Sequence, residues 1–164
     1  MTNIPSGSVA LPADGRQSER AAGIARGVAR LLATHGFACI CEVPLANGRR
    51  ADVVAVSEAG DIWIVEIKSS LEDFRTDQKW PEYREFCDRM LFAVAVDFPV
   101  DILPGDAGLI IADRFGGEIV RPAPEHRLAG ARRKAMTLRF ARAAAFRLSA
   151  LYDPEAVFEQ LVRA

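Results

Sequence analysis

The sequence predicts an α/β domain whose mixed central sheet, an antiparallel meander plus one parallel strand, is flanked by helices. Three short apolar segments with glycine-ended turns precede a helical segment and a further apolar segment, which is the order expected for such a sheet. The chain has 164 residues, 50% hydrophobic and 26% charged, which is enough for one domain with its own core. We expect residues 1–16 to form a flexible N-terminal arm and residues 17–164 to form this domain.

The first expected helix spans Ser18 to His35. Apolar residues recur on one face of this segment, and charged residues fall on the opposite face. Gly36 is expected to end the helix, because glycine readily adopts the left-handed conformation found after a helix C-terminus. The apolar face consists of Ile24, Val28, Leu31 and Leu32, and the charged face of Glu19, Arg26 and Arg30.

Three strands are expected next, over residues 37–43, 49–57 and 61–69. The last two are apolar on both faces, which is typical of central strands covered on both sides. Each turn between the strands ends in glycine, as a three-residue hairpin loop with a left-handed third residue prefers. The two turns, Ala46-Asn47-Gly48 and Glu58-Ala59-Gly60, therefore predict two antiparallel hairpins.

A helix should follow the third strand and run over about residues 70–88. Ser69 and Glu72 have the spacing of a capping box, which marks a helix N-terminus. Pro81 lacks a backbone N–H and disfavours helical geometry in the residue before it, so it predicts a kink or a break.

The apolar segment 90–96 is expected to be a buried strand. It should lie parallel to the strand that ends at Lys68, because a strand, helix, strand connection within one sheet is right-handed. The remaining expected elements are a hairpin over residues 108–121, a long helix over residues 128–152 and a short helix over residues 154–162.

Composition argues against several classes of protein. The longest apolar runs are too short to span a bilayer, and the first dozen residues do not have the pattern of a secretory signal. A cytoplasmic protein that does not contact a membrane is expected. Cys39, Cys41 and Cys87 form no closely spaced metal-binding pair and are expected to be reduced residues in or near the core. With only two histidines, a zinc enzyme is not expected.

The net charge is only −1, but the charges are unevenly distributed. Residues 52–106 contain thirteen acidic and five basic side chains, whereas residues 127–147 contain seven basic and no acidic ones. A basic strip of this kind is typical of contact with a phosphate backbone. A solvated helix face is an equally good interpretation of the same pattern.

Four residues of the late helix fall within one narrow arc: Arg132, Arg139, Arg142 and Phe146. We expect the arginines to contact phosphates and Phe146 to stack on a base. An ordinary exposed face with Phe146 in the core is the alternative. Further candidates for DNA contact are Arg49, Arg50 and Lys79.

Glu66 and Lys68 are the only charges in a strand that is otherwise apolar. Residues two apart in a strand share a face, and buried charges cost about several kcal/mol each unless they are paired or bind metal. If Glu58-Ala59-Gly60 is a three-residue loop, the register sets Asp52 directly opposite Glu66. The side chains of Asp52, Glu66 and Lys68 are then neighbours on one face of the sheet.

The other hairpin adds Glu42 to this group. A three-residue Ala46-Asn47-Gly48 loop sets Glu42 opposite Asp52, whereas a two-residue Asn47-Gly48 turn would move it to the other face. Like charges opposite one another destabilise a sheet, and a divalent cation such as Mg²⁺ relieves the repulsion. A buried salt bridge between the carboxylates and Lys68 is the alternative.

The spacing of Asp52 and Glu66-Ile67-Lys68, with thirteen residues between them, resembles the PD-(D/E)XK nuclease superfamily. Three longer strings look like those of the MmcB-type DNA repair endonucleases of bacteria, and the similarity covers roughly residues 18–152. The sequence departs from the superfamily pattern at Ala51, where a proline often precedes the aspartate. The strings are Gly48-Arg49-Arg50-Ala51-Asp52, Glu66-Ile67-Lys68-Ser69-Ser70 and Asp77-Gln78-Lys79-Trp80-Pro81-Glu82-Tyr83.

The resemblance implies a restriction-endonuclease-like fold and a metal-dependent DNA endonuclease that acts in DNA repair, with residues 17–164 as a single nuclease-like domain. It implies Mg²⁺ or Mn²⁺ as cofactor, held by Asp52, Glu66 and the Ile67 carbonyl, with Lys68 beside the attacking water. Glu42 is a better candidate than Glu19 for the additional acidic residue of the superfamily. DNA is the expected partner, and a second copy or another repair protein is a further candidate. The alternative is a non-catalytic or partner-dependent nucleic-acid-binding protein that retains the nuclease fold.

Overall fold

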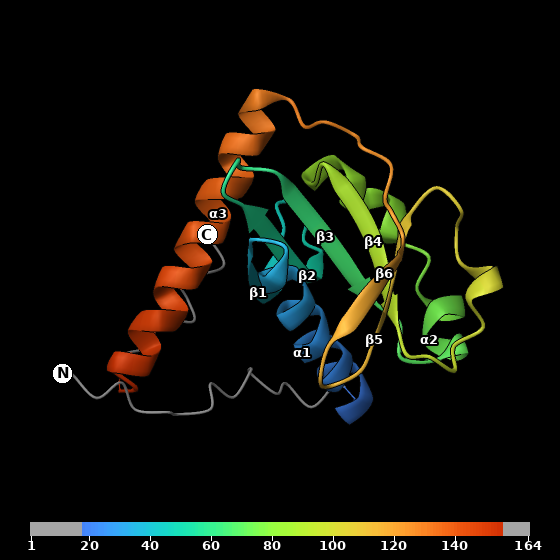
Figure 1. Ribbon diagram of the computed structural model, residues 1–164. Helices are drawn as coiled ribbons and strands as arrows, with labels where there is room; N and C mark the ends of the chain where they lie inside the picture. The colour runs from blue at the N-terminus through green and yellow to red at the C-terminus, as the bar shows by residue number, and fades with distance from the viewer. Residues whose placement is uncertain (1–17, 156–164) are drawn as a thin grey trace.

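The computed structural model describes residues 18–155, so the expected arm and most of the expected helix over residues 154–162 lie outside the described residues. One six-stranded sheet runs through the described part of the chain, and helices lie on both of its faces (Figure 1). The elements are α1 (Glu19–Thr34), β1 (Phe37–Pro44), β2 (Arg50–Ser57), β3 (Ile62–Ile67), α2 (Leu71–Thr76), the 3-10 helix η1 (Trp80–Phe86), β4 (Arg89–Val94), the 3-10 helix η2 (Val100–Ile102), β5 (Gly108–Ala112), β6 (Gly117–Arg121) and α3 (Gly130–Tyr152).

Helix α1 confirms the first expected element. Its N-cap is Ser18, whose side chain accepts a hydrogen bond from the Ala21 N–H at 3.1 Å, and Gly36 follows its C-cap with a φ of 78°. Ile24, Val28 and Leu32 of the expected apolar face are buried against the sheet and Leu31 is half-buried, and α1 contacts all six strands. Gly27 brings the helix close to the β5–β6 turn, because a Cβ there would lie only 1.8 Å from the Asp113 carbonyl oxygen.

Both predicted hairpins form in the predicted register. Gly48 and Gly60 adopt φ values of 79° and 85°, the left-handed conformation that the third loop position requires. The Leu45 N–H donates to the Arg49 carbonyl at 2.8 Å, so the Ala46-Asn47-Gly48 loop has three residues rather than two. Strand β1 pairs antiparallel with β2, and β2 with β3, as expected.

The predicted helix over residues 70–88 is wrong in three details. Its cap is one residue later than expected, because Ser70 accepts from the Asp73 N–H at 3.1 Å while the Asp73 carboxylate accepts from the Ser69 N–H at 2.9 Å. The helix ends at Thr76, before the break expected at Pro81. Its second part, η1, is a 3-10 helix with proline among its first residues. The N–H groups at a helix start have no acceptor within the helix, so the N–H that proline lacks costs no hydrogen bond there.

The second half of the sheet has one more parallel strand pair than the sequence predicted. Strand β4 is parallel to β3 as predicted, but β5 is also parallel to β4, so the sheet has two parallel pairs. The expected hairpin over residues 108–121 is the antiparallel pair of β5 and β6, which closes that edge of the sheet. Strands follow one another in space in the order β1 to β6.

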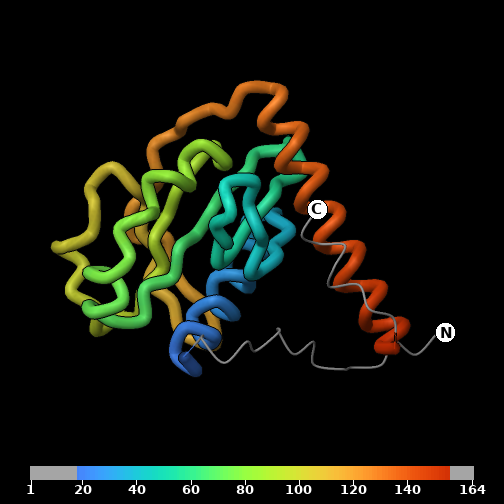
Figure 2. The backbone as a smooth tube through the Cα atoms, turned by 180° about the vertical axis from the view of Figure 1, so that it is seen from behind, coloured from blue at the N-terminus to red at the C-terminus, as the bar shows by residue number. Residues whose placement is uncertain are grey.

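Helices α2, α3 and η1 lie on the face of the sheet opposite α1. Figure 2, from behind, shows α3 as a long diagonal rod that touches the body of the domain along one side. Only Met136 and Ala143 of this helix are buried, and the helix contacts β1, β3 and η1. Most of the surface of α3 is therefore accessible at one end of the sheet.

Candidate metal centre

Asp52 and Glu66 lie on adjacent strands at the position that the hairpin register predicts. Val53 pairs with Val65, and one further step along both strands sets Asp52 opposite Glu66. Directly opposed residues of an antiparallel pair project from the same face of a sheet. The Ile67 N–H donates to Asp52 Oδ2 at 2.8 Å, which ties the Asp52 side chain to the end of β3.

Lys68 lies beside this pair and is almost completely buried. Its side chain is 2% exposed, and its Nζ donates to Glu66 Oε1 at 3.3 Å and to Asp77 Oδ2 at 2.9 Å. Reasoning from the sequence missed Asp77, although this residue begins the string that ends at Tyr83. The early end of α2 explains its position, because the chain leaves helical geometry at Asp77 and turns the carboxylate towards Lys68.

The cluster contains more negative than positive charge. When all are ionised, the three carboxylates and the one ammonium leave two negative charges, and Glu66 Oε2 is buried without a hydrogen-bond partner among the described residues. Burial and the nearby Asp52 raise the pKa of Glu66 to about 9. Burial also raises the pKa of Asp52 to about 6, although the hydrogen bond from Ile67 opposes the rise.

Lys68 stays charged in this environment. Burial lowers its pKa, but the attraction of Glu66 and the hydrogen bond to Asp77 outweigh burial and hold the pKa above its ordinary value. For Asp77, burial favours the neutral form, but the hydrogen bond from Lys68 lowers the pKa of the carboxyl overall. Lys68 and Asp77 therefore form an ion pair, whereas burial beside Asp52 favours the neutral form of Glu66.

Glu42 is the weakest member of the predicted ligand set. The register sets it opposite Asp52 as predicted, but it has a φ of 56° and interrupts the regular pairing of β1 with β2. Its carboxylate pairs with the Arg50 guanidinium at 2.5 Å. Within residues 18–155, no three acidic, histidine or cysteine side chains are grouped as ligands for one ion, so a cation here would need the Ile67 carbonyl or water as well. The metal-binding roles of Asp52, Glu66, Ile67 and Glu42 stay predictions.

The residues predicted to contact DNA divide into two groups. Near the cluster, Arg49 pairs with both carboxylate oxygens of Glu82 at 2.9 and 3.0 Å, Arg50 pairs with Glu42, and Lys79 is exposed. Their contacts with DNA remain predictions.

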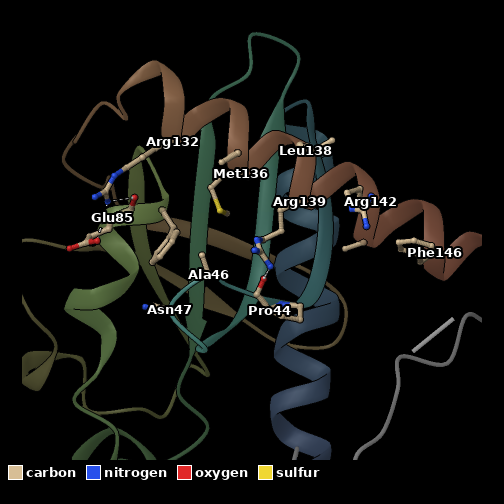
Figure 3. Close-up of a pocket in the computed structure, with 13 residues that line it drawn as sticks. Pro44, Ala46, Asn47, Glu85, Arg132, Met136, Leu138, Arg139, Arg142 and Phe146 are labelled. Carbon is tan, nitrogen blue, oxygen red and sulfur yellow. Dashed lines mark hydrogen bonds and ion pairs between the residues drawn. The ribbon is translucent and has the colours of Figure 1, made fainter. Parts of the chain in front are cut away.

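The second group lies together in one groove beside α3 (Figure 3). There Arg132 pairs with Glu85 at 3.0 Å, Arg139 donates to the Pro44 carbonyl at 3.0 Å, and the Arg142 guanidinium lies 5.4 Å from the centre of the Phe146 ring. The basic strip of residues 127–147 is partly structural, since Arg133 pairs with buried Asp88 and Arg147 donates to the carbonyls of Cys41 and Glu42.

Comparison with known proteins identifies a family. Residues 9–155 match the model of a family described as DNA repair protein MmcB-like. A solved structure described as a protein of unknown function from Silicibacter pomeroyi is 48% identical, with a TM-score of 0.83 over 86% of this chain and 97% of that chain. No curated protein matches the chain. Among the described residues, no helix is both long and apolar enough to pass through a membrane.

Proposed function

Because the chain belongs to the MmcB-like family of DNA repair proteins, we propose that it is a DNA nuclease of the PD-(D/E)XK type that requires Mg²⁺ or Mn²⁺. The family supports a role in DNA repair and contact with DNA, and the match confirms the resemblance to MmcB-type DNA repair proteins. One observation carries the proposal of catalysis: Asp52 and Glu66 are held side by side, and a buried oxygen of Glu66 has no partner among the described residues.

The chemistry of the cluster suits a hard divalent cation. Carboxylate oxygens are the ligands that Mg²⁺ and Mn²⁺ prefer, and when Asp52, Glu66 and Asp77 are all ionised two negative charges remain after Lys68 is counted. We propose that Asp52 and Glu66 hold the ion together with the Ile67 carbonyl. Burying a carboxylate without a partner is costly, so the absence of a second donor at Glu66 needs a functional reason.

The protein's own residues would position the reactants. A divalent cation, when bound, lowers the pKa of water and stabilises negative charge on phosphoryl oxygens. Lys68, held by Glu66 and Asp77, would direct its ammonium at the attacking water or at a phosphoryl oxygen. Asp77 contacts Lys68 rather than the reacting atoms, so its role is to position the ammonium.

Cleavage of DNA by matched variants tests this proposal. We expect the purified chain to nick supercoiled or branched DNA only with Mg²⁺ or Mn²⁺, and expect Asp52→Asn and Lys68→Ala each to remove that activity. Glu58→Gln, an exposed hairpin substitution, should cleave like the unaltered protein. Binding of Mn²⁺, followed by calorimetry, should be lost in Asp52→Asn while the circular dichroism spectrum is kept. Equal cleavage by all four proteins would refute the proposal.

A second candidate function is DNA binding without independent cleavage. It is favoured by the ion pair of Lys68 with Asp77, because this pair lets the cluster persist without a cation. In that case the chain binds DNA with a strong dependence on salt concentration but shows no turnover with any divalent metal. A repair partner would then supply or activate the cutting step.

A further inference from the structure

An open groove of about 590 Å³ lies between α3 and the loop that joins β1 to β2 (Figure 3). Its walls are mainly apolar and include Phe86, Met136 and Phe146. Most of the polar residues that line the groove are cationic, namely Arg132, Arg139 and Arg142 of α3. The groove therefore combines an apolar floor with a basic rim.

The charges around this groove favour an anionic ligand. Helix α3 has six basic and no acidic side chains between Gly130 and Tyr152. Glu85 is the one carboxylate among the groove residues, and its charge is already compensated by Arg132 at 3.0 Å. The net positive charge is thus presented along one wall, where a chain of phosphates could follow the helix.

The apolar floor favours an unpaired DNA strand over a duplex. In a duplex the faces of the bases are stacked inside the helix, so an apolar surface has little to bind. In an unpaired strand the base faces are open, and stacking on aromatic or guanidinium surfaces contributes about 1–3 kcal/mol per base. Arg142 and Phe146 form a cation–π pair, with the guanidinium carbon 5.4 Å from the ring centre, and both line the groove.

The groove also lies close to the candidate metal centre. Pro44 in its wall pairs with Arg50 across β1 and β2, and Asp52 is two residues, about 7 Å, further along β2. We infer that the groove binds an unpaired DNA strand, so that the substrate is DNA with a single-stranded segment next to the cleavage point. This inference rests on the proposed function for the choice of DNA as ligand.

Binding without cleavage tests the inference. Fluorescence anisotropy of the full chain in EDTA would compare an oligothymidylate with a duplex of the same length. We expect the single strand to bind at least about tenfold tighter, since stacking of one base is worth that factor. Ala46→Glu and Arg142→Ala, both in the groove, should each weaken single-strand binding about tenfold. Ala59→Glu on the other hairpin and Lys134→Ala on α3, both outside this groove, should change it less than about twofold.

Three outcomes would overturn the inference. The first is a duplex that binds as tightly as the single strand. The second is a matched control that weakens binding as much as its groove variant, which would mean diffuse electrostatic attraction. The third is groove variants with unchanged affinity for the single strand, which would leave the groove to another ligand such as an acidic amphipathic helix. Groove-dependent binding without cleavage in Mg²⁺ or Mn²⁺ would instead refute the nuclease proposal alone.

Discussion

Two buried acidic residues of this domain have opposite environments. Asp88 is 1% exposed, and each of its oxygens accepts two hydrogen bonds, one from a backbone N–H and one from the Arg133 guanidinium. Glu66 is 4% exposed, but it accepts one hydrogen bond, from Lys68 at 3.3 Å, and its second oxygen has no partner among the described residues.

The pKa values of the two carboxyls differ accordingly. For Asp88, burial opposes ionisation, but the hydrogen bonds from Arg133, Ile62 and Leu128 lower its pKa overall. Burial and the nearby Asp52 raise the pKa of Glu66 to about 9. A buried carboxylate whose oxygens all accept hydrogen bonds stabilises a fold. A buried carboxylate with one oxygen that accepts none, beside a second carboxylate, is suited to binding a ligand. The predictions that follow test this difference.

The largest expected effect is on stability. Asp88→Asn should lower the free energy of unfolding by about 3–5 kcal/mol, because it leaves the Arg133 charge without its partner and takes a carboxylate acceptor from the Ile62 and Leu128 N–H groups. Urea unfolding measures this. Glu85→Gln is the matched control, since it breaks an exposed pair between Arg132 and the body of the domain and should cost no more than about 1 kcal/mol. Equal losses in the two variants would contradict the structural role of Asp88.

Glu66→Gln should change stability little but reduce cleavage strongly. The amide replaces a carboxyl that burial already disposes to stay neutral, so the free energy of unfolding should change by less than about 1 kcal/mol. Cleavage should fall at least about a hundredfold, because even outer partners of metal ligands affect metal affinity by up to that factor. Urea unfolding and a plasmid-nicking assay on the same preparation measure both. A stable variant with full activity would remove Glu66 from the site.

Lowering the pH should reduce the difference in unfolding free energy between Asp88→Asn and the unaltered protein. The pKa of Asp88 is lowered by folding, so its contribution to stability is present above the unfolded value of about 3.9 and is lost as pH falls through the folded value. The difference in unfolding free energy should be full at neutral pH and should shrink below about pH 4. Urea unfolding at a series of pH values measures it. A difference that stays constant down to pH 2 would show that ionisation of Asp88 is not its cause.

The smallest expected effect concerns Asp77. Asp77→Asn keeps an acceptor 2.9 Å from Lys68 but removes the opposite charge, so the ammonium should be less well positioned. We expect kcat for cleavage to fall about tenfold with KM nearly unchanged, since no contact with bound DNA is removed. Asp77→Glu should restore part of the rate. A change in KM alone would assign Asp77 to binding instead.

The sheet and the candidate site depend on chemistry that is local in sequence. Gly48 and Gly60 set the loop lengths, the loop lengths set the register, and the register sets Asp52 opposite Glu66. Each step uses only neighbouring residues, so the sequence predicts it.

Other features depend on distant partners and were missed. The contact of Asp77 with Lys68, nine residues away, depends on the early end of α2 at Thr76, which no periodicity reveals. The parallel pairing of β4 with β5 depends on the whole sheet rather than on the connection between the two strands. The basic strip looked uniform in sequence, yet Arg133 and Arg147 are bound within the protein while Arg142 lines the groove.

Anomalous scattering from crystals soaked in Mn²⁺ tests most directly whether Asp52 and Glu66 form a cation site. A metal centre predicts one peak at roughly 2.1 Å from an oxygen of each carboxylate, the distance expected for a small divalent ion, and no peak in Asp52→Asn. A map with no peak between the two side chains at saturating Mn²⁺, from a protein that still cleaves DNA, would contradict it.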